Sequence, residues 1–135
     1  LKFLKRPAIN LHISYLPYNR GAHPNFWSFL ENTPSGITIH EIDQGVDTGK
    51  IIFQKKIFFN VNKNKNLTFK STYRTLNEKI VDLFIKKADL ILKKKYSTKK
   101  QNNKISTFHL KKELPSYMNN WNMKILSVKK KYGTK

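Results

Sequence analysis

Hydrophobic and polar residues alternate near the start of the chain, where the segment Ala-Ile-Asn-Leu-His-Ile-Ser occupies residues 8–14. A period of two predicts a β-strand. Because successive side chains of a strand point to opposite faces, Asn10 and His12 lie on one face and point the same way. Pro17 and the Arg-Gly pair that follows end the strand, so the polar pair is expected near its C-terminal end. That is the edge at which open α/β sheets bind ligands.

The rest of the first half continues this pattern of strands and short connections. A helix is predicted over residues 24–31, because Pro24 is tolerated in a first turn, where its missing N–H would be unpaired anyway. Turn residues follow at 32–36. Two further strands are predicted, over residues 37–42 and over residues 50–59 with a bulge near Lys55, separated by a glycine-containing loop at 43–49.

One long amphipathic helix is predicted after the polar loop at residues 60–66. Thr68 suits the N-cap, since its hydroxyl can accept from a free backbone N–H of the first turn. Apolar residues then recur at steps of three and four, and this stripe is expected to pack against the sheet. Its members are Phe69, Tyr73, Leu76, Ile80, Leu83, Phe84, Leu90 and Ile91.

Composition adds a strong positive charge, +19 over 135 residues. A basic surface gains affinity for phosphates by releasing counterions, so nucleic-acid binding stays open as a less favoured partner. However, only three of the 27 basic residues are arginine, and asparagine, isoleucine and phenylalanine are also abundant. Biased composition therefore explains most of the charge, and a solvated lysine surface is the default. No run of 18 apolar residues and no secretory pattern is present, so a cytoplasmic protein without a membrane partner is expected.

An amide, an imidazole and a carboxylate form the candidate catalytic set: Asn10, His12 and Asp47. Such groups can move an acyl group onto an amine, because hydrogen bonds aimed at the acyl oxygen stabilise its developing negative charge. A carboxylate beside His12 is expected to raise the imidazole pKa and keep it protonated. The chain has no cysteine, which excludes a thiol acyl-enzyme. A zinc or iron site at His12, His40 and Asp47 is the rival hypothesis, but their spacing gives it little support, and no metal is predicted. His40 is expected to be a buried supporting residue.

Several motifs together resemble the folate-dependent formyltransferases. They are Asn-Leu-His-Ile-Ser-Tyr-Leu-Pro at residues 10–17, Arg20-Gly21, Gly-Ile-Thr-Ile-His at 36–40 and Asp-Thr-Gly at 47–49. The resemblance implies that Asn10, His12 and Asp47 form the catalytic triad and that 10-formyltetrahydrofolate is the formyl donor. It also implies folate contacts for the loop residues Ile42, Asp43, Gln44, Gly45 and Val46. A simple surface turn is the alternative for this loop.

The acceptor is expected to be a small-molecule primary amine. The residues around Tyr15-Leu16-Pro17 and after Arg20-Gly21 look more like the sugar-nucleotide N-formyltransferases than like the methionyl-tRNA enzymes, which stay open as the alternative. Tyr15 and Arg20 are candidate substrate-binding residues, because a guanidinium can hold a phosphate or carboxylate by two hydrogen bonds. Arg20 bracing the loop is the other interpretation.

The resemblance also sets the expected fold, the C-terminal portion of a Rossmann-like α/β formyltransferase domain. It has a mixed sheet with flanking helices and lacks the N-terminal strands that the family places first. Residues 1–60 would form the catalytic part, residues 61–96 the loop and long helix, and residues 97–135 a loosely attached basic tail that caps the acceptor site. An inactive truncated fragment and a homodimer both stay open.

Overall fold

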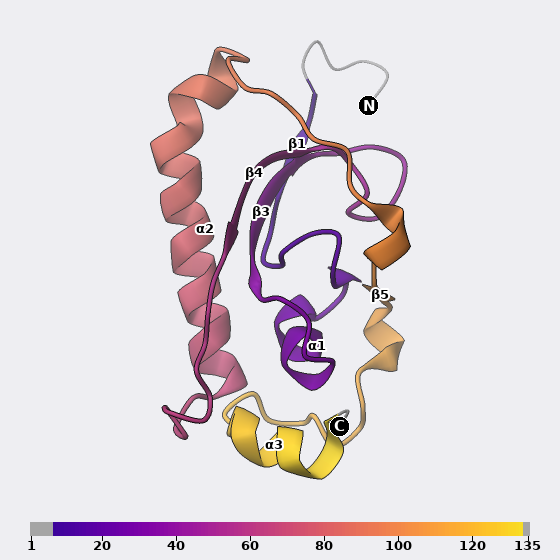
Figure 1. Ribbon diagram of the computed structural model, residues 1–135, viewed down its shortest axis with the longest axis vertical. Coiled ribbons are helices and arrows are strands. Elements are labelled where there is room, and N and C mark those ends of the chain that lie inside the picture. Colours follow the sequence, from indigo (N-terminus) through magenta and orange to yellow (C-terminus); the bar gives the residue numbers. More distant parts are fainter. Residues whose placement is uncertain (1–6, 134–135) are drawn as a thin grey trace.

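The computed structural model describes residues 7–133, in which a three-stranded antiparallel sheet is flanked by helices (Figure 1). The sheet has the order β1-β3-β4, and a smaller sheet pairs β2 with β5 in parallel. The strands are β1 Ile9–His12, β2 Arg20–Gly21, β3 Gly36–Glu41, β4 Ile51–Lys56 and β5 Phe108–His109. The helices are α1 Pro24–Leu30, α2 Phe69–Leu92 and α3 Ile125–Tyr132, with short 3-10 turns at Asn103–Ile105 and Lys111–Glu113. The α/β class and the predicted strands and helices of the first 92 residues are confirmed.

The long helix α2 begins at the predicted cap. The Thr68 hydroxyl accepts the Ser71 N–H at 3.0 Å, while the Ser71 hydroxyl accepts the Thr68 N–H at 3.0 Å. These two bonds satisfy backbone donors that a helix start leaves free. The apolar stripe is buried at Leu76 and Ile80, but the prediction for Tyr73 is wrong, since it is 53% exposed. Tyr73 lies at the margin of the stripe, and Thr72 takes the buried position instead.

The two faces of the sheet differ in polarity as the alternation requires. Leu11 and Ile37 pack with Leu76 and Ile80 of α2, so α2 covers the apolar face. Asn10 and His12 alternate with those residues and point to the other face. After α2 the chain returns along that opposite side of the sheet, toward β5 and then α3 (Figure 1). The polar face is therefore enclosed between the sheet and the C-terminal part of the chain.

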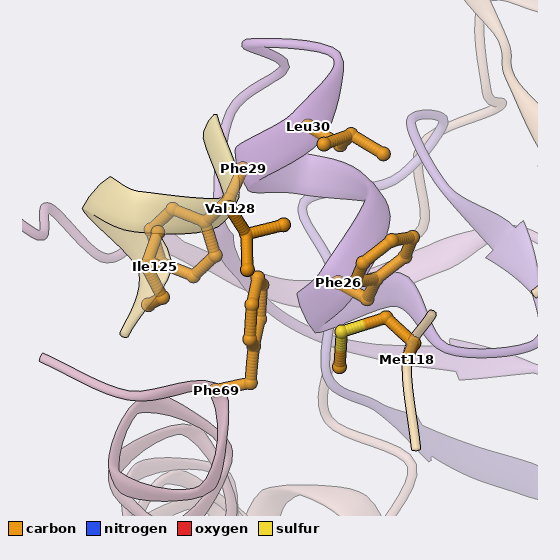
Figure 2. Close-up of a cluster of buried hydrophobic side chains, with 7 residues drawn as sticks. All are labelled: Phe26, Phe29, Leu30, Phe69, Met118, Ile125 and Val128. Atoms are coloured by element: carbon orange, nitrogen blue, oxygen red, sulfur yellow. The ribbon is translucent and has the colours of Figure 1, made fainter. Parts of the chain in front are cut away.

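A second core joins α1, the start of α2 and the last third of the chain (Figure 2). Phenylalanines of α1 and α2 meet side chains from residues 118–128, of which Ile125 is 0% and Val128 2% exposed. Fully burying such side chains stabilises the fold by roughly 1.5–3 kcal/mol each. The cluster comprises Phe26, Phe29, Leu30, Phe69, Met118, Ile125 and Val128. The expectation of a loosely attached tail is wrong, because these apolar residues are too few for a domain of their own and complete the core of α1.

The strand irregularity also differs from the prediction. The pairing of β3 with β4 shifts between Ile39 and His40, which face Phe53 and Ile51 respectively. Ile52 is thus the extra residue, and the bulge lies there instead of near Lys55. A bulge turns the strand and re-aims neighbouring side chains, and here it lies opposite His40, beside the candidate site.

Candidate active site

Asn10 and His12 stand next to each other on the polar face of β1, at the point where β1 pairs with β3. Asn10 lies opposite His40 and His12 lies opposite Thr38 in the antiparallel register. His12, Thr38 and His40 are buried, with exposed fractions of 7% or less. The side chains of Asn10, His12 and His40 thus lie on the same face of the sheet, as the sequence pattern predicted for Asn10 and His12.

Asp47 reaches this face from the loop that follows β3. Its Oδ1 accepts from Asn10 Nδ2 at 3.1 Å, and its Oδ2 accepts from the Gly21 N–H at 2.9 Å. His12 Nδ1 lies 3.7 Å from Oδ2, within ion-pair distance but longer than a hydrogen bond. Asp47 adopts a left-handed φ of 54°, which is uncommon for a residue with a side chain. The structure therefore brings the three predicted catalytic residues together around one carboxylate.

The surroundings of Asp47 favour its charged form. Burial by itself would raise the pKa of this carboxyl group. A hydrogen bond from His40, the nearby His12 and the Gly21 N–H outweigh that effect and lower the pKa to about 2. Asp47 is consequently a carboxylate at every pH at which the protein would work.

His12 does not have the charge that the sequence predicted. Burial lowers its pKa below the ordinary 6.5, and this effect exceeds the opposite influences of Asp47 and of the hydrogen bond to the Asn19 carbonyl. His12 Nε2 lies 3.0 Å from that carbonyl oxygen, which can only accept, so Nε2 carries the hydrogen. At neutral pH the ring is uncharged, and its bare Nδ1 faces Asp47. The prediction that His12 is protonated before the reaction is therefore wrong. The free-energy cost of burying a charged ring exceeds the attraction of one carboxylate at 3.7 Å.

His40 of β3 contacts both Asn10 and Asp47. Its Nδ1 lies 2.8 Å from the Glu41 carbonyl oxygen, while Nε2 lies 3.4 Å from both Asn10 Nδ2 and Asp47 Oδ1. At 2% exposure it is the buried supporting residue that the sequence predicted. Among residues 7–133, no group of three or more histidine, aspartate or glutamate side chains is arranged to hold a metal ion.

The loop predicted to contact folate runs along the rim of this cluster. Ile42 to Val46 are all exposed, and the side chains of Ile42 and Val46 are 41% and 55% accessible. Asp43 holds the loop in shape by accepting from the Gly45 N–H at 3.1 Å and from the Thr48 hydroxyl at 2.5 Å. Folate contacts of these residues stay a prediction, while their position beside Asp47 follows directly from the chain.

Tyr15 and Arg20 do not reach an open site. Tyr15 packs against Gly36, with Lys56 Nζ 5.0 Å from the ring centroid. The Arg20 side chain is buried, and its guanidinium donates to Gln101 Oε1 at 3.0 and 2.7 Å and to Asn103 Oδ1 at 2.8 Å. These bonds direct Nε and both hydrogens of Nη2 at protein side chains. The structure therefore supports the bracing interpretation of Arg20 and gives Tyr15 a packing position.

Three residues outside the predicted set complete the site. Asn19, at a φ of 56°, presents its carbonyl to His12, Gly21 presents its N–H to Asp47, and Gln101 donates to the carbonyls of Asp47 and Gly49. The sequence carries a weak signal for the first two, since asparagine and glycine tolerate left-handed backbone in a turn. Gln101 lies in a polar stretch that looks like a linker, and nothing local marks it.

A cavity of about 890 Å³ opens beside His12. It is lined by His12, by His23 and Asn25 at the start of α1, by Tyr73 of α2 and by residues 119–122, which include Trp121. Trp121 is 38% exposed and stacks with His23 at 5.5 Å between ring centroids. Among the described residues, Asn25 Oδ1 is buried without a hydrogen-bond partner. The C-terminal part of the chain thus forms one wall of the cavity next to the catalytic candidates.

Comparison with known proteins places this geometry in context. A family model described as formyl transferase matches residues 1–86. A methionyl-tRNA formyltransferase of Thermodesulfovibrio yellowstonii is 35% identical over 111 residues, 78% of this chain and 33% of that protein. A dTDP-4-amino-4,6-dideoxyglucose formyltransferase of Mycobacterium bovis is 43% identical over 49 residues, 36% of this chain and 21% of that protein. The chain therefore spans a third or less of these curated relatives.

Two solved structures resemble the chain more completely. The formyltransferase PseJ of Anoxybacillus kamchatkensis, in complex with UDP-4,6-dideoxy-4-formamido-L-AltNAc and tetrahydrofolate, superposes with a TM-score of 0.80 at 40% identity, covering 90% of this chain and 64% of that one. An N-formyltransferase of Helicobacter canadensis, in complex with folinic acid and dTDP-3-aminofucose, gives a TM-score of 0.73 at 32% identity, covering 79% and 39%. No helix in the described part of the chain has the length and apolar character needed to cross a membrane.

Proposed function

The chain belongs to the formyl transferase family, and from this membership we propose that the protein transfers a formyl group from 10-formyltetrahydrofolate to a primary amine. The observation that carries the proposal is the convergence of Asn10, His12 and Asp47 beside the cavity of about 890 Å³. Amide, imidazole and carboxylate are the groups that acyl transfer to an amine requires.

The exposed loop fits the formyl donor. Ile42 and Val46 offer apolar surface on either side of an accessible backbone stretch, which suits a flat ring with an amide-like edge. We assign residues 42–46 to hold the donor, next to the Asp47 carboxylate. When bound, the donor supplies a formyl carbonyl on nitrogen, which an amine can attack.

We assign to Asn10 the role of hydrogen-bond donor to the oxygen of the formyl carbonyl. One hydrogen of its Nδ2 is held by Asp47 at 3.1 Å, and the second makes only a longer contact of 3.4 Å with His40. That second hydrogen can be given to the oxygen on which negative charge develops. A fixed donor of this kind needs no rearrangement at the moment of reaction.

We assign to His12 the role of general base, which takes the proton that the attacking amine loses. Its neutral ring has a bare Nδ1, and Asp47 Oδ2 lies 3.7 Å from that atom. As the amine attacks the formyl carbon, Nδ1 accepts the proton that the amine loses, and the permanent charge of Asp47 stabilises the imidazolium so formed. The imidazolium then returns that proton to the donor nitrogen as the bond between this nitrogen and the formyl carbon breaks, so that tetrahydrofolate leaves neutral. The lowered pKa of His12 thus leaves the base free before the reaction, and Asp47 supports it afterwards.

For the acceptor we propose a nucleotide-linked amino sugar that binds in the cavity. The exposed Trp121 stacked with His23 offers an aromatic surface for a base, and the amides of residues 119–122 offer partners for sugar hydroxyls. The two solved relatives whose complexes contain a UDP-linked and a dTDP-linked sugar support this class. The longer match to a methionyl-tRNA formyltransferase keeps methionyl-tRNA as the second candidate.

Tetrahydrofolate release by the full-length protein tests the proposal. The protein would be given 10-formyltetrahydrofolate with UDP- and dTDP-linked amino sugars in one series and methionyl-tRNA in another. We expect turnover with an amino sugar, and loss of it in His12→Ala. Turnover with methionyl-tRNA alone would replace the acceptor, and absence of turnover with every amine would overturn the proposed formyl transfer.

A further inference from the structure

The backbone at Asp47 needs support from outside its own loop. Asp47 has a φ of 54° and follows the exposed stretch Ile42 to Val46. Left-handed backbone is costly for a residue with a side chain and persists only where its surroundings hold it. The bonds that its side chain receives from Asn10 and Gly21 fix the carboxylate but not the main chain.

Gln101 makes the missing main-chain contacts. Its Nε2 donates to the Asp47 carbonyl at 2.8 Å and to the Gly49 carbonyl at 2.7 Å, so both of its hydrogens are used on the loop. Its Oε1 accepts from Arg20 Nε at 3.0 Å and from Arg20 Nη2 at 2.7 Å. A primary amide has two donors and two acceptor sites. Every one of them is engaged here. If the Gln101 amide were flipped, its NH₂ group would face the Arg20 guanidinium, and two donors would oppose each other.

Arg20 connects this contact to the rest of the site. Its neighbour Asn19 holds the His12 ring through the backbone carbonyl, and its neighbour Gly21 holds the Asp47 carboxylate through the backbone N–H. Three consecutive residues therefore touch the histidine, the Gln101 amide and the aspartate. A shift of any one of them moves the other two.

Gln101 is itself held at both sides. Lys99 pairs with Ile51 through two backbone hydrogen bonds of 2.8 and 2.9 Å, which attaches the segment to the start of β4. On the other side, the Thr107 carbonyl accepts the Arg20 N–H at 3.0 Å, next to the pairing of β5 with β2. The amide is thus presented from a segment anchored to two sheets.

From these contacts we propose that Gln101 is a positioning residue, which sets the distance between the Asp47 carboxylate and the His12 ring through the main chain of the Asp47–Gly49 turn. The catalytic role that it supports rests on the proposed function. A side chain in this place must both donate twice and accept twice. Glutamate would keep the acceptors for Arg20 but turn oxygen toward two carbonyls, and leucine would do neither.

Gln101→Leu and Gln101→Glu test the proposal in the full-length protein. The matched control is Asn102→Asp, which makes the same change of charge as Gln101→Glu one residue away and keeps the oxygen that accepts the Lys104 N–H. We expect both Gln101 variants to lower kcat on the order of 10- to 100-fold with the KM of the amine little changed, as small misplacements of reacting groups do. The control should match wild type.

A double-mutant cycle separates positioning from general support of the fold. If Gln101 acts through Asp47, adding Gln101→Leu to Asp47→Asn should cost less than about twofold more in kcat. NMR titration gives a readout that does not need activity: the pKa of the Asp47 carboxyl, about 2 in wild type, should rise toward 3.8 in Gln101→Leu. An unchanged Asp47 pKa, or an equal loss of kcat in both backgrounds, would overturn the proposal. A wild-type protein without formyl transfer but with the shifted pKa would overturn only the proposed function.

Discussion

Replacing Asp47 by asparagine tests whether the charged Asp47 carboxylate stabilises the folded state. The side chain is 11% exposed and is held by the Gly21 N–H and the Asn10 amide. Its pKa falls from 3.8 to about 2, just under two units. At about 1.4 kcal/mol per unit, the charged form stabilises the folded state by at most roughly 2.5 kcal/mol. Asparagine keeps the shape and loses this contribution.

The sign of the effect fixes its pH range. A carboxyl group whose pKa is lower in the folded state stabilises the fold above the unfolded pKa, here 3.8, and loses that contribution as pH falls through the folded value of about 2. Wild type should therefore exceed Asp47→Asn in free energy of unfolding at pH 6 by up to about 2.5 kcal/mol, and by less than this limit while the His12 ring is uncharged. The difference should shrink steadily from about pH 4 to pH 2.

Equilibrium urea unfolding of the full-length protein at several pH values measures this difference. Asp82→Asn is the matched control, because Asp82 makes only an exposed ion pair with Lys86 on α2. Such pairs contribute about 0–1 kcal/mol. A gap between wild type and Asp47→Asn that is near zero at pH 6, or that stays constant down to pH 2, would refute the electrostatic account of the site.

The other predictions concern turnover. Asn10→Ala should lower kcat on the order of 10²–10³-fold, as loss of an oxyanion donor does, and equal kcat in wild type and variant would remove Asn10 from that role. The acid limb of the kcat profile should lie below pH 6.5, since burial lowers the pKa of His12, and it should move lower still in Asp47→Asn; a limb above 6.5 would contradict a neutral His12. Trp121→Ala should raise the KM of a nucleotide-linked amine with little change in kcat, whereas Lys86→Ala on the exposed side of α2 should change neither value.

The parts of the fold set by local pattern could be predicted from the sequence. The alternation around Asn10 and the apolar stripe of α2 each follow from a period that one segment carries alone, and Thr68 caps its helix through neighbouring residues. The pairing of β2 with β5 could not be predicted, because it joins two-residue strands that lie far apart along the chain. For the same reason the core position of Ile125 is not visible in its basic surroundings.

The candidate site divides in the same way. The residue types in the first strand and the resemblance to the folate-dependent formyltransferases predicted Asn10, His12 and Asp47, which the fold brings together. The charge of His12 could not be predicted, because its sign depends on how far burial outweighs one carboxylate. The partner of Arg20 was equally hidden, since Gln101 comes from a segment some eighty residues further along the chain.

The cluster of Asn10, His12 and Asp47 is proposed to transfer a formyl group to an amine. Mass spectrometry of the acceptor after reaction with the full-length protein and 10-formyltetrahydrofolate tests it most directly, using wild type, His12→Ala and the control Lys86→Ala. We predict that wild type and Lys86→Ala add one formyl group to a nucleotide-linked amino sugar and that His12→Ala does so at least 10²-fold more slowly, as loss of a proton-transfer group implies. Equal formylation by His12→Ala and wild type would contradict the claim.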